Sequence, residues 1–201
     1  MNRLLFVTLA FALLPACSVS APRSAPPAIA GGTIVVLPPN NRTGDPLLVA
    51  GASFFEKYAL QSDRITVPDV LAAEARQQLA RRGFEVIAAE RVSEAIGTRV
   101  PTDASNAADL AATHQLNGMV LYIEIRRWEA DVPVHPVFVI ASVEASLIEP
   151  STGRVLWSKD HPSRPIPTPG VVNLGDAYSI AARALVTELV RELGVEQPPN
   201  S

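Results

Sequence analysis

The residue types that most often carry out catalysis are few in this sequence and widely spaced. The three histidines, His114, His135 and His161, fall on different predicted elements, and none has a carboxylate at a metal-binding spacing. The sequence contains no Gly-x-Ser-x-Gly turn, no phosphate-binding loop ending in Gly-Lys-Ser/Thr, and no His-Glu-x-x-His helix. We therefore expect no metal, no cofactor and no enzymatic activity.

Glu124 and Glu144 are the one carboxylate pair that could work together. They fall on two strands predicted to pair, and across those strands they could form an acid–base couple. Alternatively, both side chains lie on a wet face of the sheet, opposite Arg126 or Arg127. We favour this second interpretation because opposite charges commonly pair across neighbouring strands.

The segment 38–45 follows the first predicted strand and is rich in turn-forming residues. Asn40, Asn41 and Asp45 can hydrogen-bond to their own backbone, so turn chemistry explains most of the segment. Arg42 is left without such a role. It is either a contact for a binding partner or a solvated charge.

A second candidate binding segment is unusually apolar for a loop. Phe54, Phe55 and Tyr58 are a large share of a chain in which aromatic residues make up 5%. If exposed, these side chains mark an interface; the alternative is a flap that covers one face of the sheet. The candidate partner-binding residues are therefore Arg42, Phe54, Phe55 and Tyr58.

Cys17 is the only cysteine of the chain, and it follows a short apolar run. Arg3 precedes that run, which extends from Leu4 to about Leu14 and is too short to span a bilayer. The end of the run, Leu14-Pro15-Ala16-Cys17, resembles the lipobox of bacterial lipoproteins. That resemblance implies cleavage before Cys17 and acylation of Cys17. The alternative is an ordinary signal peptide with an unpaired cysteine.

The resemblance to lipobox proteins also implies a location. Ser18 stands where the common inner-membrane retention signal has Asp, so we expect a protein anchored by lipid to the outer membrane and facing the periplasm. The net charge of -3 argues against nucleic acid as a partner, because phosphate binding needs a basic surface.

Composition and patterning divide the chain into four parts. The expected parts are a signal peptide (1–16), the lipidated cysteine with a Pro- and Ser-rich linker (17–32), a single α/β domain (33–195) and a loose tail (196–201). An apolar fraction of 48% and a charged fraction of 18% are typical of a globular domain.

The first half of the domain has the pattern of a β-α-β unit. A β-branched run at 33–37 predicts a buried strand, and a helix is expected after the candidate N-cap Thr66. Gly83 has the position of a helix-ending residue, and a second strand is expected at 84–87. A short helix over 49–60 also fits the pattern.

The second half predicts two helices, three strands and a last helix. Alternation of apolar and polar residues is clearest at 137–147, where Val137 to Leu147 place every second side chain on one face. The four prolines between 162 and 169 predict an irregular loop. The expected elements are helices at 89–96, 104–116 and 175–193, and strands at 119–128, 137–147 and 154–159.

The order β-α-β-α-α-β-β-β-α indicates an α/β (α+β) fold. We expect a mixed β-sheet with a β-α-β start, a three-stranded antiparallel meander and helices packed mainly on one face.

Three segments resemble a group of outer-membrane lipoproteins that includes LpoB and CsgG and whose domain is similar to the N-terminal domain of TolB. The segments are Leu37–Thr43, Asn117–Ile123 and Ser151–Ser158, the last with a Thr-Gly-x-x-x-Trp turn. The resemblance implies a non-enzymatic lipoprotein that docks on a protein partner of the cell envelope. Service to an export or ABC-type transport complex, self-association through a sheet edge or the Phe54–Phe55 region, and an unrecognised enzyme remain as alternatives. The sequence lacks the extra strands of a CsgG-type channel.

Overall fold

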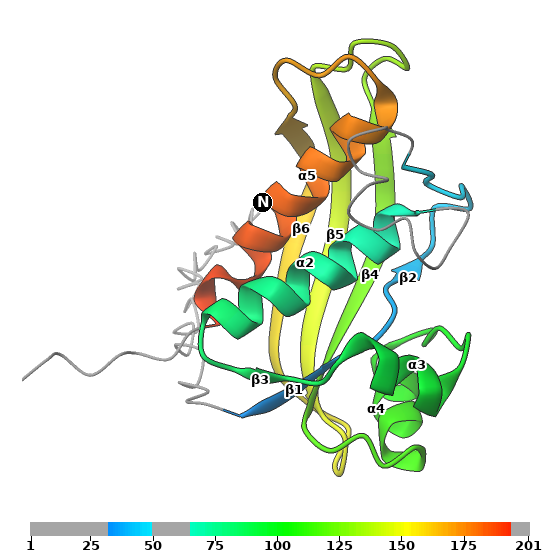
Figure 1. Cartoon of the computed structure of the whole chain (residues 1–201), viewed down its shortest axis with the longest axis vertical. Coiled ribbons are helices and arrows are strands. Elements are labelled where there is room, and N and C mark those ends of the chain that lie inside the picture. The colour runs from blue at the N-terminus through cyan, green and yellow to red at the C-terminus, as the bar shows by residue number, and fades with distance from the viewer. Residues whose placement is uncertain (1–31, 50–64, 194–201) are drawn as a thin grey trace, which may run out of the picture.

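A computed structural model describes residues 32–49 and 65–193, which form one mixed sheet with helices on both faces (Figure 1). The strands are β1 (Thr33–Val36), β2 (Asn40–Asn41), β3 (Glu85–Val86), β4 (Met119–Ala130), β5 (Phe138–Glu149) and β6 (Arg154–Pro167). The helices are α2 (Val67–Arg81), α3 (Ala89–Ile96), α4 (Ala104–Thr113), α5 (Leu174–Leu189) and the 3-10 turn η1 (Val190–Glu192). None of the helices in these residues is long and apolar enough to cross a membrane.

The strands lie in the order β3-β1-β4-β5-β6, and β2 pairs with β4 beyond the end of β1. Strand β1 runs parallel to both β3 and β4, whereas β4, β5 and β6 form an antiparallel meander. The α/β fold class, the β-α-β start and the meander are therefore confirmed.

Helix α2 begins where its capping residues predict. The Thr66 hydroxyl oxygen accepts a hydrogen bond from the Asp69 N–H (3.4 Å), and the Asp69 carboxylate accepts one from the Thr66 N–H (2.9 Å). This reciprocal pair is a capping box, which satisfies two N–H groups that the helix itself leaves free. After the helix, Gly83 has a φ of 84°, a left-handed conformation that glycine adopts without strain.

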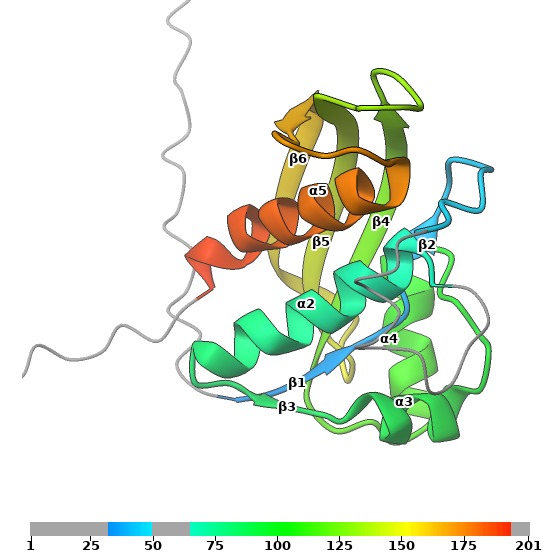
Figure 2. The same ribbon diagram turned by 45° about the horizontal axis from the view of Figure 1, so that its top comes forward.

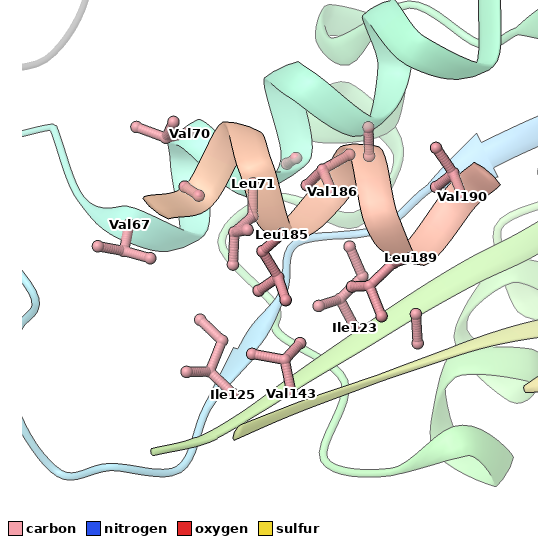
Figure 3. Close-up of a cluster of buried hydrophobic side chains, with 14 of the residues drawn as sticks. Val67, Val70, Leu71, Ile123, Ile125, Val143, Leu185, Val186, Leu189 and Val190 are labelled. Atoms are coloured by element: carbon pink, nitrogen blue, oxygen red, sulfur yellow. The ribbon is translucent and has the colours of Figure 1, made fainter. Parts of the chain in front are cut away.

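The two long helices α2 and α5 pack side by side on one face of the sheet, which we call the covered face (Figures 1 and 2). The alternation predicted for β5 supplies that face, because Val139, Val143 and Leu147 are all fully buried there. Leucines and valines of both helices fill the space above Ile123, Ile125 and Val143 (Figure 3). Burying each such side chain stabilises the fold by about 1.5–3 kcal/mol.

The short helices α3 and α4 pack on the opposite face, but they cover only part of it (Figure 2). From β4, only Val120 and Tyr122 join the apolar cluster on that side, and from β5 only Ile148 joins it. The rest of this side, from Glu124 onward along β4, is the open face.

The structure corrects the prediction of an irregular loop at the prolines. Strand β6 continues through Pro162 and Pro165 and ends at Pro167. Proline lacks the N–H that a central strand needs, but β6 has a neighbour on one side only, and edge strands tolerate proline. Pro162 also falls within an irregularity of the β5–β6 register, between the pairs of Ala141 and Val143.

Smaller differences concern the ends of elements. Helix α4 ends at Thr113 rather than Leu116, because the chain turns at Gln115 with a φ of 54°. Val137 lies before β5 and is 62% exposed, although the alternation placed it with the buried residues.

Candidate functional site

The open face of the sheet carries a connected group of charged side chains near its centre. We call it the charged network: Arg42, Glu124, Arg126, Glu144 and Asp160. Its three carboxylates come from β4, β5 and β6 and stand in line, since Glu124 pairs with Glu144, and Glu144 pairs with Asp160.

Arg42 reaches the network because the short strand β2 runs alongside β4. Asn40 and Asn41 pair with Glu124 and Ile125, and the Arg42 N–H donates to the Ile125 carbonyl (2.9 Å). The guanidinium of this side chain, which is 61% exposed, then lies 3.5 Å from the Glu124 carboxylate. The residue that turn chemistry left unexplained is therefore an ion-pair partner with most of its surface still free.

The turn around Arg42 is built partly as the sequence predicts. The Asn41 side-chain oxygen accepts hydrogen bonds from the N–H (3.1 Å) and the hydroxyl (2.8 Å) of Thr43, as in an Asx turn. The side chain of Asn40 does something else. It donates to the Thr102 carbonyl (3.0 Å) and to the Tyr122 hydroxyl (3.2 Å), so it joins β2 to β4 and to the segment before α4.

Glu124 is the buried centre of the network, with 8% of its surface exposed. One carboxylate oxygen accepts from the Tyr122 hydroxyl (3.1 Å) and faces Arg42, while the other accepts from Nε of Arg126 (2.8 Å). Burial alone would raise the pKa of Glu124. The hydrogen bonds from Arg126 and Tyr122, together with both positive charges, outweigh it and hold the pKa below its ordinary value.

Arg126 holds the three carboxylates together. Besides Glu124, its guanidinium donates to the Glu144 carboxylate and lies 3.5 Å from the Asp160 carboxylate. An irregularity of the register between Ile125 and Arg127 lies at this position. Like charges directly opposite each other would destabilise the sheet, and the guanidinium among them removes that repulsion.

This geometry favours one of the two interpretations of Glu124 and Glu144. Arg126 stands between the two carboxylates and pairs with both, which is the arginine pairing that the second interpretation expects. The partner of the pair is Arg126, since Arg127 instead binds Glu129 (2.7 Å) and Ser163 (3.1 Å). The expectation of a wet face holds for Glu144, whose side chain is 33% exposed, but not for Glu124, which is buried although it lies on the same open face.

The other predicted site residues lie outside the described part of the chain. Cys17, Phe54, Phe55 and Tyr58 are not among residues 32–49 and 65–193, so lipidation and the aromatic interface stay predictions. Within the described residues, no three His, Cys, Asp or Glu side chains gather as metal ligands would.

His161 has partners that its sequence neighbours do not reveal. It is 1% exposed between β6 and α5, with Nδ1 3.3 Å from the Glu188 carboxylate and 3.3 Å from Nε of Arg164. Burial lowers the pKa of His161, and the carboxylate of Glu188 offsets only part of that shift. The sequence separation from Glu188 hides this group, because only the packing of α5 on β6 brings the two residues together.

A hollow of about 790 Å³ lies beyond the carboxyl end of β1, between α2 and α3. Arg76 of α2 lines it and donates to the Val36 carbonyl (3.1 Å), while its Nε is buried without a partner. Burial lowers the pKa of Arg76, although Glu90 and Asp69 act in the opposite direction. The hollow is mainly apolar, with one cation and two carboxylates around it.

Comparison with known proteins finds similar folds among solved structures only. No protein-family model matches the sequence, and neither does any curated protein. Among solved structures, the PelC dodecamer from Paraburkholderia phytofirmans is 19% identical, covers 87% of this chain and 96% of its own, and has a TM-score of 0.54. The lipoprotein GNA1162 from Neisseria meningitidis is 20% identical over 78% of this chain and 94% of its own, with a TM-score of 0.43.

LpoB from Escherichia coli is 15% identical over 83% of this chain and 84% of its own, with a TM-score of 0.42. The similarity to PelC shows a shared fold. LpoB, which the sequence motifs pointed to, is thus among the structural neighbours, and the resemblance to CsgG and TolB stays a prediction.

Proposed function

We propose that this protein is a lipid-anchored lipoprotein of the cell envelope that faces the periplasm and docks on a protein partner through its open face. The anchor rests on the lipobox-like segment ending at Cys17. The docking surface rests on one observation, the charged network on the part of the sheet that α3 and α4 leave uncovered.

The network is suited to recognition because its groups are already held in place. Arg126 is bound by three carboxylates, and Glu124 by the Tyr122 hydroxyl and two guanidinium groups, so little side-chain freedom remains to be lost on binding. Two guanidinium groups face three carboxylates, which leaves one negative charge in excess. Asp160 is the most exposed carboxylate, so we infer that the partner presents a cation there.

Two other functions are kept as alternatives. The protein is an auxiliary subunit of an export or ABC-type transport complex, in which case the partner belongs to that machine. Alternatively, it assembles with copies of itself, and the dodecamer of PelC, which shares the fold, makes this worth testing. The aromatic residues Phe54, Phe55 and Tyr58 remain candidates for either interface.

Crosslinking in cells tests the docking surface. A photoreactive amino acid replaces Ser158, which is exposed beside the network, and in a control replaces Arg81, which is exposed at the end of α2. We expect one envelope protein to be crosslinked from position 158 and not from 81, and Asp160→Asn to reduce its yield severalfold. Equal yields from both positions contradict docking by the open face. Recovery of this chain alone favours self-assembly.

The anchor is tested separately. Cys17→Ala should release the protein from the membrane fraction into the soluble fraction. A mutant that sediments with membranes as the wild type does would show that Cys17 carries no anchor.

A further inference from the structure

One end of the described domain is markedly apolar. We call it the apolar tip: the loop 131–137 between β4 and β5, and the segment 167–172 at the end of β6 and after it. Eight large hydrophobic side chains are exposed in the described residues, and half of them are here. They are Val132 (43% exposed), Val134 (64%), Val137 (62%) and Val172 (61%). Such clustering distinguishes the tip from the scattered apolar residues of ordinary surfaces.

The two segments of the tip hold each other in place. The His135 N–H donates to the Val172 carbonyl (3.1 Å), and the Thr168 N–H donates to the Val137 carbonyl (2.8 Å). The buried Thr168 hydroxyl donates to the Pro136 carbonyl (3.1 Å). These bonds keep His135 at a φ of 55°, which non-glycine residues seldom adopt. The valines are therefore presented on a fixed backbone.

The tip carries few charged groups and few backbone N–H donors. Asp131 is the one Asp, Glu, Lys or Arg in its two segments, and its carboxylate accepts hydrogen bonds from the N–H groups of Val137 (3.0 Å) and Phe138 (3.4 Å). Four residues of the tip have no N–H at all, namely Pro133, Pro136, Pro167 and Pro169. A backbone with few free donors is what an apolar solvent requires.

The tip lies at the opposite end of the sheet from β1, the first strand of the described domain (Figure 1). Met119 pairs beside Ile34 at one end of β4, and the twelve residues of that strand carry the chain about 40 Å to the tip. The fifteen residue steps from Cys17 to Gly32 span at most about 50 Å. A lipid-anchored chain is thus long enough for the tip to touch the bilayer that holds its own anchor.

We propose that the apolar tip inserts into the interfacial layer of that bilayer, as a second membrane contact. The inference rests on the lipid anchor of the proposed function. A lipid surface is the occupant that these features favour, because the tip has a single charged side chain and four prolines without an N–H, and the linker is long enough to bring it to the bilayer. The lipid anchor and the apolar contact together orient the domain, which the linker alone would leave free to rotate. The charged network then faces a fixed direction.

The test uses the full-length lipidated protein in phosphatidylethanolamine–phosphatidylglycerol vesicles. Val134→Cys places a fluorescent label at the tip, and acylation of Cys17 leaves this thiol as the one available for labelling. Val155→Cys is the matched control, since Val155 is a valine of similar exposure (47%) near the other end of the sheet. Vesicle lipids with a quencher on the acyl chain report insertion.

Insertion predicts at least twofold stronger quenching of the label at 134 than at 155. Equal quenching, or none at either position, overturns the proposal. A further outcome is that the label at position 134 is shielded from water only as protein concentration rises, with no quenching by lipid. That result also overturns the proposal and assigns the tip to a protein contact. Failure of the anchor is seen separately, as wild-type protein that does not sediment with vesicles and whose Cys17 accepts the label.

Discussion

The covered face and the open face of the sheet are made by alternate residues of the same strands, yet they are held in different ways. On the covered face, Ile123 and Ile125 of β4 pack under α2 and α5. On the open face, Glu124 lies between those two residues and joins Arg42 and Arg126. The first arrangement gains stability from area removed from water, and the second depends on direction and charge.

Along strand β4, residues that stabilise the fold alternate with residues that are available for recognition. Apolar packing tolerates replacement of one side chain by another of similar shape, whereas the charged network requires each charged side chain at its own position. We therefore expect substitutions on the covered face to change mainly stability, and substitutions at the rim of the open face to change mainly binding.

The largest effect is expected from Ile123→Ala on the covered face. Ile123 is 1% exposed, so the substitution leaves a cavity beneath α5 and lowers the free energy of unfolding by about 2–5 kcal/mol. Urea denaturation followed by circular dichroism measures it. Val155→Ala, at an exposed site, serves as the control and should change the value by less than about 0.5 kcal/mol.

Glu124→Gln is expected to have the next largest effect, about 1.5–3 kcal/mol, because it removes hydrogen bonds between charged groups at a buried position. Tyr122→Phe removes only the neutral donor to the same carboxylate and should cost less. If both substitutions prove neutral in denaturant titrations, the network does not stabilise the sheet.

The two faces should also lose stability in different pH ranges. On the covered face, burial lowers the pKa of His161 from 6.5, so below pH 6.5 the unfolded chain binds a proton that the folded chain refuses. Stability therefore falls as pH drops below 6.5, by at most about 1.4 kcal/mol for each pH unit. On the open face, the pKa of Glu124 lies below its ordinary value of 4.5. The stability that Glu124 contributes is therefore present above pH 4.5 and lost as the pH falls below it.

Unfolding titrations between pH 7 and 3 measure both ranges. His161→Gln should flatten the part between 6.5 and 5 while leaving the loss below 4.5. The groups around His161 on β6 and α5 are Asp160, Arg164 and Glu188, and Glu188→Gln should steepen the upper part because it removes the charge that favours protonation. A curve that is flat down to pH 5 in the wild type would contradict the assignment to His161.

The smallest change in stability is expected for Asp160→Asn at the exposed edge of the network. Exposed ion pairs contribute about 0–1 kcal/mol, so its unfolding curve should nearly overlay that of the wild type. The same variant should weaken crosslinking of the partner from position 158. A variant that loses stability but keeps its crosslink would reverse the comparison between the two faces.

Local patterns were enough to predict most of the elements. The capping residues of α2, the alternation along β5 and the β-α-β order all depend on neighbours within a few positions, and all are found in the structure. The continuation of β6 through Pro162 and Pro165 could not be predicted, because whether a proline is tolerated depends on whether its strand lies at an edge.

The candidate site was predictable only in part. Arg42 stands out in the sequence as the residue that turn chemistry does not use, and Glu124 and Glu144 stand out on alternating strands. That a short strand β2 would bring Arg42 to Glu124, and that Arg126 would stand among three carboxylates, follows from pairings between distant segments.

By itself, the sequence determined the helices, the strands and their buried sides, since propensity, capping and periodicity act between residues close along the chain. It also supplied the lipidation signal at Cys17 as a prediction. The tertiary structure alone decided which side of the sheet stays open, which charges meet on it, and that four valines gather at one end. These features depend on strand order and register, which bring together residues that local sequence cannot relate.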